Sequence, residues 1–208
     1  MLDFVRGALQ FENTIFKDCQ KHFEDLVHGQ KPNALFITCS DSRLDPNLIT
    51  QSKPGELFIC RNVGNIVPPH SHQTGAMTVC IEYSLGILNV PHIVVCGHYG
   101  CGAMQAAMQP ESVCKMPHTS TWLSYVEAAT LVVQDRYAEL DDAGKLDHLV
   151  EENIRLQISH LKTHPYVVRA LAQKRLQIHG WVFDLRKGKI KVLREEQDEF
   201  VSLREKYI

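Results

Sequence analysis

The chain has 208 residues, and its 22 Lys and Arg nearly balance its 24 Asp and Glu, giving a formal net charge of −2. Without a basic block, this balance argues against a nucleic acid or an anionic membrane as the partner and favours a small molecule. No apolar run approaches the roughly 18 residues of a membrane span, and Asp3 and Arg6 stand where a secretory leader would be apolar. We therefore expect a cytoplasmic protein.

The seven cysteines do not have the pattern of a disulfide framework. Their number is odd and their spacing is irregular, and a chain of this length buries a core large enough to fold without covalent staples. This composition favours a reducing compartment in which the thiols are free or bound to a metal.

Short apolar runs alternate with helical patterns along the first half of the chain. Apolar residues between 2 and 28 recur at helical spacing and predict an amphipathic helix. Residues 34–38, 57–61 and 92–96 are apolar runs bounded by turn residues, which is typical of buried strands. A helical segment over 77–88 lies between the second run and the third.

The second half is mostly helical before a final hairpin. We expect a helix after Gly102, two helices over 119–140 and 146–163, a short helix after Pro165, and a hairpin over 176–185 and 189–193. This order predicts an α/β fold with a mostly parallel central sheet of four or more strands flanked by helices. The simplest organisation is a single domain over 1–208, in which an N-terminal helical arm (1–28) precedes the core (29–208).

Four residues that can bind a metal follow two of the predicted strands. Cys39 and Asp41 come after the first strand, and His98 and Cys101 come after the third. Ligands bind at the carboxyl ends of the strands in open α/β sheets, so these side chains can converge at one edge. Two thiolates, one imidazole and one carboxylate suit tetrahedral zinc, and we expect one Zn²⁺ per subunit. The alternative is that these cysteines are small buried apolar side chains.

Arg43 follows Asp41 by two residues. A bidentate pair with the guanidinium would hold the carboxylate off the metal and leave the fourth position open to water. Zinc lowers the pKa of bound water from about 15.7 towards roughly 7, so hydroxide becomes available near neutral pH. This arrangement is typical of a hydration or hydrolysis catalyst, whereas a closed structural zinc site usually has four Cys or His ligands.

These segments also resemble a known family. Cys-Ser-Asp-Ser-Arg at 39–43 and His-Tyr-Gly-Cys-Gly at 98–102 are similar to the two signatures of the β-class carbonic anhydrases, and the resemblance extends through 61–65, 81–83 and 179–183. It implies a β-carbonic anhydrase-like fold and the zinc-dependent, reversible hydration of carbon dioxide to bicarbonate and a proton by a zinc-bound hydroxide. The implied zinc ligands are Cys39, His98 and Cys101.

The resemblance also implies roles for other residues. Asp41 would be the fourth zinc ligand in a closed state, and in an open state it would pair with Arg43 and orient the zinc-bound hydroxide. The residues implied to contact substrate or to line a small apolar pocket are Gln30, Phe58, Val63, Tyr83 and Gly102. Part of this wall would come from a neighbouring subunit, so a homodimer is the smallest expected assembly.

Phe36 and Thr38 stand where a regulated, closed subtype of the family has tryptophan and glycine. The chain therefore resembles the open-site, plant- and bacterial-like subtype. Two other functions stay open at this point. The same zinc hydroxide is suited to attack another linear heterocumulene, such as carbon disulfide or carbonyl sulfide. The second alternative function is a zinc-binding scaffold without catalysis, although such a scaffold would have no evident use for the Asp41–Arg43 pair.

Overall fold

The computed structural model describes residues 2–72 and 74–208, and the chain divides into two compact units, Met1–Lys31 and Pro32–Ile208. The first unit is helical. In it α1 (Asp3–Gln10) and α2 (Phe16–Leu26) are joined without a break by the π-helical turn η1 (Phe11–Ile15). The predicted N-terminal helix is confirmed, and the π-helical turn within it is a feature that the apolar periodicity did not reveal.

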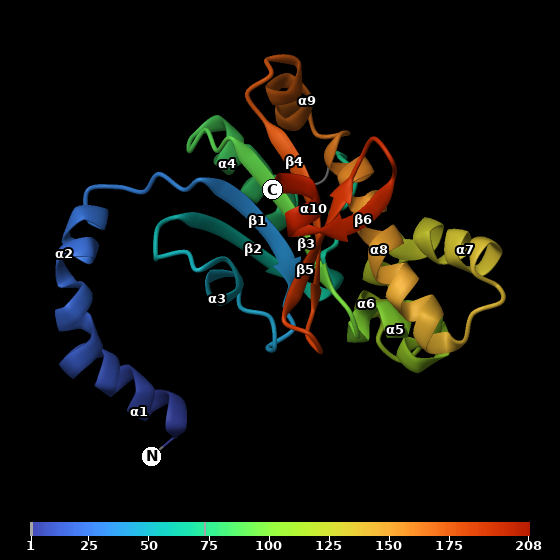
Figure 1. Ribbon diagram of the computed structural model, residues 1–208, viewed down its shortest axis with the longest axis horizontal. Helices are drawn as coiled ribbons and strands as arrows, with labels where there is room; N and C mark the ends of the chain where they lie inside the picture. The colour runs from blue at the N-terminus through green and yellow to red at the C-terminus, as the bar shows by residue number, and fades with distance from the viewer. Residues whose placement is uncertain (1, 73) are drawn as a thin grey trace. The chain divides into compact units, whose positions relative to one another are not determined.

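The second unit is built on a six-stranded sheet (Figure 1). Its strands are β1 (Ala34–Cys39), β2 (Leu57–Asn62), β3 (His92–His98), β4 (Gln177–Asp184), β5 (Lys189–Arg194) and β6 (Glu199–Ser202). They lie in the order β2-β1-β3-β4-β5-β6, in which the first four are parallel and the last two pairings are antiparallel. The predicted α/β fold with a mostly parallel sheet is confirmed, and the predicted hairpin is an extension of that sheet.

Helices and short helical turns connect the strands. They are α3 (Pro46–Thr50), η2 (Val63–Asn65), α4 (Ala76–Gly86), α5 (Gly102–Met108), η3 (Pro110–Val113), α6 (Pro117–Leu123), η4 (Ser124–Val126), α7 (Glu127–Arg136), α8 (Asp142–Leu161), α9 (Pro165–Ala172) and α10 (Leu203–Tyr207). The longest is α8, whose N-cap Asp141 accepts a hydrogen bond from the Gly144 N–H.

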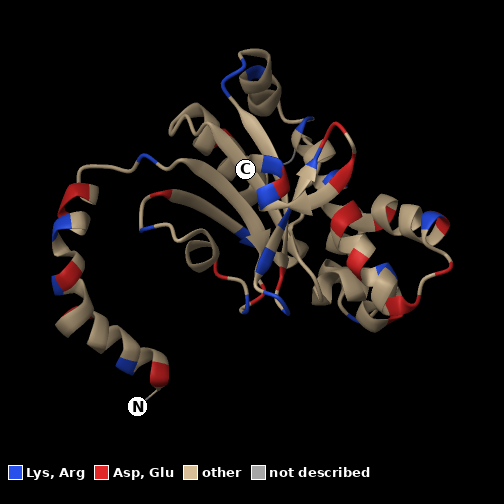
Figure 2. Ribbon diagram, in the orientation of Figure 1, with Lys and Arg blue, Asp and Glu red and all other residues tan. Residues whose placement is uncertain are grey.

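The central strands are buried because both faces of the sheet are covered. β1 is buried at every position, and its side chains alternate between two cores. Leu35 and Ile37 belong to a large core shared with α4, α7, α8 and α9, whereas Phe36 packs with Leu44 and Val94 in a smaller core on the opposite face. Lys, Arg, Asp and Glu are absent from β1 and β3 and lie mainly in the helices, the loops and the C-terminal strands (Figure 2).

Three parts of the second unit differ from the sequence-based expectation. The helix predicted over 119–140 is two helices, α6 and α7, separated by the 3₁₀ turn η4, where the Ser124 hydroxyl donates to the Thr121 carbonyl oxygen at 2.7 Å and competes with helical pairing. β6 and α10 were not anticipated, because β6 has four residues and little alternation. A sequence signal for α10 was nonetheless present, since Ser202 and Glu205 form a capping box.

No helix in the described part of the chain combines the length and the apolar character that a membrane crossing requires.

Candidate metal centre

Two adjacent parallel strands bring the predicted metal ligands together. Cys39 is the last residue of β1 and His98 the last of β3, and these strands pair directly. Cys101 follows after the turn at Gly100, whose φ of +68° is easily adopted by glycine, and it is the N-cap residue of α5. The three side chains therefore come from the carboxyl edge of the sheet and the loop that follows it.

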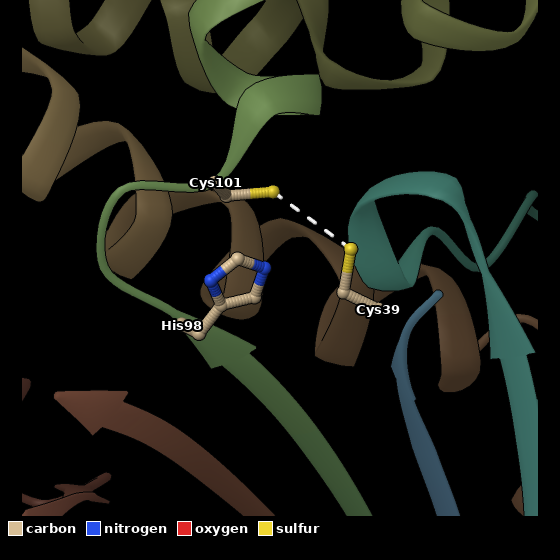
Figure 3. A group of neighbouring side chains, drawn as sticks. All are labelled: Cys39, His98 and Cys101. Carbon is tan, nitrogen blue, oxygen red and sulfur yellow. Dashed lines mark hydrogen bonds between the residues drawn. The ribbon is translucent and has the colours of Figure 1, made fainter. Parts of the chain in front are cut away.

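The ligand atoms of Cys39, His98 and Cys101 all lie within 4.8 Å of one another. The two Sγ atoms are 3.9 Å apart, and both thiols and the imidazole ring face a common space (Figure 3). All three residues are buried, with His98 at 0% exposure. The convergence that the sequence predicted is therefore present in the structure.

The environment of His98 suits a metal. Its Nδ1 lies 3.1 Å from the Tyr99 carbonyl oxygen, which can only accept, so Nδ1 carries the proton and Nε2 offers a lone pair. Nε2 is buried and has no hydrogen-bond partner, although such groups are nearly always paired. A backbone carbonyl that orients a histidine is common around metal ligands. With two thiols beside that lone pair, the donor set fits zinc.

The two cysteines interact strongly with each other. A hydrogen bond from the Cys101 thiol, opposed by burial and aided by the Gly64 N–H, lowers the pKa of Cys39 to about 4. The same hydrogen bond and burial raise the pKa of Cys101 far above its usual value. One negative charge is thus already favoured at the sulfur pair, and thiolate is the form that binds metals.

Asp41 lies beside the three ligand residues without belonging to their group. Its Oδ1 accepts from Arg43 Nε at 2.9 Å and its Oδ2 from Nη2 at 2.6 Å, so the pair is bidentate. The Arg43 backbone N–H also donates to Oδ1 at 3.0 Å. These bonds hold the pKa of Asp41 well below its usual range. The expected Asp41–Arg43 pair is therefore formed, and the carboxylate is ionised at neutral pH.

Arg61 stabilises the loop after β1 that carries Asp41 and Arg43. This role was not among the sequence-based predictions. Its Nε donates to the Cys39 carbonyl oxygen at 3.1 Å, and its Nη2 donates to those of Asp41 at 2.7 Å and Leu44 at 2.8 Å. Arg61 belongs to segment 61–65, which carries part of the family resemblance. That resemblance was the sequence feature that could have indicated a role for Arg61 at the site. The contacts themselves depend on the pairing of β1 with β2.

Two residues predicted to line a pocket stack on each other at some distance from this centre. The rings of Phe58 and Tyr83 have centroids 5.8 Å apart. The sheet register places Phe58 opposite Leu35, four residues before Cys39, which is roughly 13 Å along the strand at about 3.3 Å per residue. Within one chain, the structure therefore does not bring this aromatic pair to the metal ligands.

The other predicted pocket residues have different positions. Val63 directly follows β2 and is 49% exposed. Gly102 begins α5 beside Cys101, and a Cβ placed on it would meet no atom within 4 Å, so it borders open space. Gln30 belongs to the first unit, and its contact with substrate stays a prediction.

Fold and site together define a class of protein: an α/β sheet protein with a buried Cys–His–Cys group that could bind a metal and an adjacent Asp–Arg pair. Comparison with known proteins narrows this class. The sequence profile of the family described as carbonic anhydrase matches residues 34–190. The chain belongs to this family, in its β class, and the family resemblance inferred from the motifs is confirmed.

Individual relatives cover almost the whole chain. A carbonic anhydrase of Pseudomonas aeruginosa is 43% identical over 205 residues, covering 99% of this chain and 93% of that protein. The solved structure of the β-carbonic anhydrase CcaA superposes with a TM-score of 0.93 at 38% identity, covering 96% of this chain and 98% of the other. A tetrameric β-carbonic anhydrase of Sordaria macrospora has a TM-score of 0.80 at 30% identity, with 93% and 98% coverage.

Proposed function

We propose that this protein is a zinc-dependent carbonic anhydrase that interconverts carbon dioxide with bicarbonate and a proton. The observation that carries the proposal is the buried convergence of Cys39, His98 and Cys101 beside the Asp41–Arg43 pair, in a chain of the β-class family. Cys39 and Cys101 would hold the zinc through their sulfurs and His98 through Nε2, with one zinc per subunit. A zinc ion in this position supplies hydroxide near neutral pH by lowering the pKa of water.

The role proposed for Asp41 is to orient the attacking oxygen. Its Oδ2 lies 3.6 Å from His98 Nε2, so the carboxylate borders the space that the metal would fill. As an ionised group it can only accept hydrogen bonds, and it would turn the proton of a nearby hydroxide towards itself and the lone pair towards the substrate. Arg43 keeps the carboxylate ionised and away from direct ligation, which is the open state of the site.

The closed state, in which Asp41 would be the fourth ligand, requires this pair to break. Arg43 makes two side-chain bonds to Asp41 and a further bond to the Gly100 carbonyl oxygen at 3.2 Å, so the carboxylate would leave a charged and geometrically matched partner. We therefore propose the open site as the resting form near neutral pH.

We propose that the apolar pocket is completed between subunits. Phe58 and Tyr83 lie too far along the sheet to reach the metal ligands of their own chain, yet Tyr83 is 44% exposed and available to a neighbour. The N-terminal unit also exposes large apolar side chains, including Phe4 at 74% and Leu9 at 43%. Exposed apolar surface of this extent is typical of association sites. A homodimer or a larger homo-oligomer would bury it, with Gln30 and Val63 near the substrate.

The proposed location is the cytoplasm. All seven cysteines are free of disulfides, which agrees with a reducing compartment. No contact with nucleic acid or membrane is proposed, because the charges nearly balance and lack a basic block.

Stopped-flow measurement of carbon dioxide hydration tests the function, with protein of known zinc content assayed between pH 7 and 9. We expect activity at neutral pH that is lost on chelation and restored by zinc. Activity that appears only at alkaline pH would contradict the open resting site. Stoichiometric zinc without activity throughout would contradict the proposed reaction, and the same protein would then be assayed with carbon disulfide and carbonyl sulfide.

A further inference from the structure

A tight loop after β2 contacts one of the predicted zinc ligands. The Gly64 N–H lies 3.4 Å from the Cys39 Sγ, a length within the range of hydrogen bonds to sulfur. Gly64 has φ of +83°, and a Cβ on it would meet Met104 Cε at 3.0 Å and Ala103 Cβ at 3.2 Å. Glycine is therefore required for this loop to approach the sulfur so closely.

Two buried amide side chains of α8 hold this loop from the other side. Asn153 and Gln157 are 1% and 0% exposed, and they share one face of the helix because they are four residues apart. Asn153 Nδ2 donates to the Gly64 carbonyl oxygen at 3.0 Å, and Gln157 Oε1 accepts from the Val67 N–H at 2.8 Å.

The two amides are also bonded to each other, since Gln157 Nε2 donates to Asn153 Oδ1 at 2.8 Å. A buried amide without partners costs free energy, so each of these groups constrains the next. Further contacts restrain the loop at its ends. Trp122 Nε1 donates to the Val63 carbonyl oxygen at 2.8 Å, and the Asn62 side chain bonds both backbone groups of Ile66.

We propose that Asn153 and Gln157 are positioning residues of the metal centre, which hold the Gly64 N–H against the Cys39 sulfur. The bond from Asn153 fixes the peptide that follows Gly64, and the bond from Gln157 fixes the loop three residues later. Together they restrain the direction of the Gly64 N–H, alongside Trp122, which bonds the carbonyl of the same peptide group at Val63. This inference rests on the proposed binding of zinc by Cys39, and it does not depend on which substrate is hydrated.

The reason that this contact matters is electronic as well as geometric. An N–H bonded to a thiolate withdraws electron density from the sulfur, and it orients the lone pair that would bind the metal. Groups that support metal ligands in this way commonly change metal affinity by roughly 10–100-fold when they are removed. A residue that only stabilised the fold would leave the metal–sulfur bond unchanged in the folded protein.

The test uses the full-length protein with Asn153→Leu, which removes the donor to Gly64 at similar volume. Zinc affinity is measured by competition with a chromophoric chelator, and the sulfur-to-metal charge-transfer band is recorded after replacement by Co²⁺. We expect zinc affinity to fall by about 10-fold or more. We also expect the charge-transfer band to move to lower energy, because a sulfur without the N–H bond releases its electrons more easily.

Ile158→Ala is the matched control. Ile158 is a buried residue of the same helix that lies against Gly180 of β4, and its aliphatic side chain cannot form a hydrogen bond to the loop. We expect it to lower the melting temperature while leaving zinc affinity and the cobalt band unchanged. If Asn153→Leu does not fold, Gln157→Met provides the second variant, since it removes the Val67 and Asn153 contacts, and the same two shifts are expected.

The proposal is overturned if a folded Asn153→Leu or Gln157→Met variant keeps the wild-type zinc affinity and charge-transfer energy and differs only in thermal stability, as is expected of Ile158→Ala. The proposed function fails independently of this result. Wild-type protein that binds zinc tightly but does not hydrate carbon dioxide would contradict that function, while the affinity and spectral comparison would still decide the roles of Asn153 and Gln157.

Discussion

Asp41 Oδ2 lies 3.6 Å from His98 Nε2, close enough to border the proposed metal position but too far for a hydrogen bond to the ring. The Asp41 side chain is 16% exposed, and its oxygens are occupied by Arg43. The carboxylate is therefore held at one side of the ligand set, where it accepts hydrogen bonds. This geometry agrees with two separate proposed roles, in which Cys39, His98 and Cys101 bind zinc and Asp41 orients the nucleophile.

The first prediction concerns that separation. Asp41→Asn should keep stoichiometric zinc and lose most activity, with kcat/KM reduced by roughly 100-fold or more, because an amide cannot replace an ionised acceptor and no longer matches Arg43. Zinc content by atomic absorption and hydration rates by stopped flow measure the two effects. Asp135→Asn, an exposed residue of α7, is the control and should behave as the wild type. Undiminished turnover in Asp41→Asn would rule out the assigned role.

The second prediction concerns metal removal. Without zinc the buried His98 Nε2 has no partner, so the metal-free protein should be less stable than the metal-bound protein. At free zinc 100-fold above the dissociation constant, the expected stabilisation is about 2.7 kcal/mol. Differential scanning calorimetry with chelator and with added zinc measures it.

Cys101→Ser should abolish this zinc-dependent shift, because Cys101 is one of the three proposed ligands. Cys114→Ser, at an exposed cysteine, should keep the full shift. A melting temperature that does not respond to zinc in the wild type would contradict the assigned metal centre, and an equal shift in both variants would contradict the assignment of Cys101 as a ligand.

The third prediction concerns the pocket shared between subunits. A Cys39→Ser subunit lacks a ligand, and a Phe58→Ala, Tyr83→Ala subunit lacks the aromatic pair, so each homo-oligomer should have low activity. When the two are mixed after reversible dissociation, sites that combine an intact ligand set with an intact aromatic pair should form and restore part of the activity. Activity equal to the average of the two separate variants would show that each pocket is built within one chain.

The fourth prediction concerns pH and the pair His92–His179, whose rings join β3 and β4. His179 Nε2 lies 3.2 Å from His92 Nδ1, and burial, His92 and Lys206 together lower the pKa of His179 to about 4. The unfolded chain has a histidine pKa near 6.5, so between about pH 6.5 and pH 4 it binds more protons than the folded protein. The contribution of neutral His179 to the free energy of unfolding is therefore complete above pH 6.5 and decreases as the pH falls towards 4.

Unfolding in urea at pH 7 and pH 5 measures this effect. His179→Gln should lose less stability than the wild type over this interval, by about 1 kcal/mol, because partial exposure reduces the full linkage value. His118→Gln, an exposed histidine of α6, is the control and should follow the wild type. If the free energy of unfolding of His179→Gln and of the wild type changed equally between pH 7 and pH 5, the lowered pKa of His179 would be contradicted.

Much of the metal centre could be predicted from local sequence. Cys39 and His98 each end an apolar run, and parallel strands must bring such ends to one edge of the sheet. Arg43 is close enough to Asp41 along the chain to pair with it through a single turn. The α/β class followed from the alternation of strand and helix patterns for the same reason, since each pattern reports on a few consecutive residues.

Other features depended on contacts between distant segments. Asn153 and Gln157 look like ordinary polar residues of an amphipathic helix, and only the packing of α8 against a loop about 90 residues earlier makes them fully buried. The position of Phe58 away from its own metal ligands depends on the register between β1 and β2. Neither relationship has a local sequence signal.

The α/β class, the candidate metal ligands and the Asp41–Arg43 pair could be predicted from local sequence patterns, because strand ends and short-range spacing place these side chains at one edge of the sheet. The choice of Cys39, His98 and Cys101 as the zinc ligands came from the family resemblance. The groups that surround these side chains could be identified only in the folded chain: the Arg61 contacts to three carbonyl oxygens, the Gly64 N–H at the Cys39 sulfur and the amides behind that loop. A buried polar group takes its partner from whatever segment packs beside it, so these contacts depend on the whole fold.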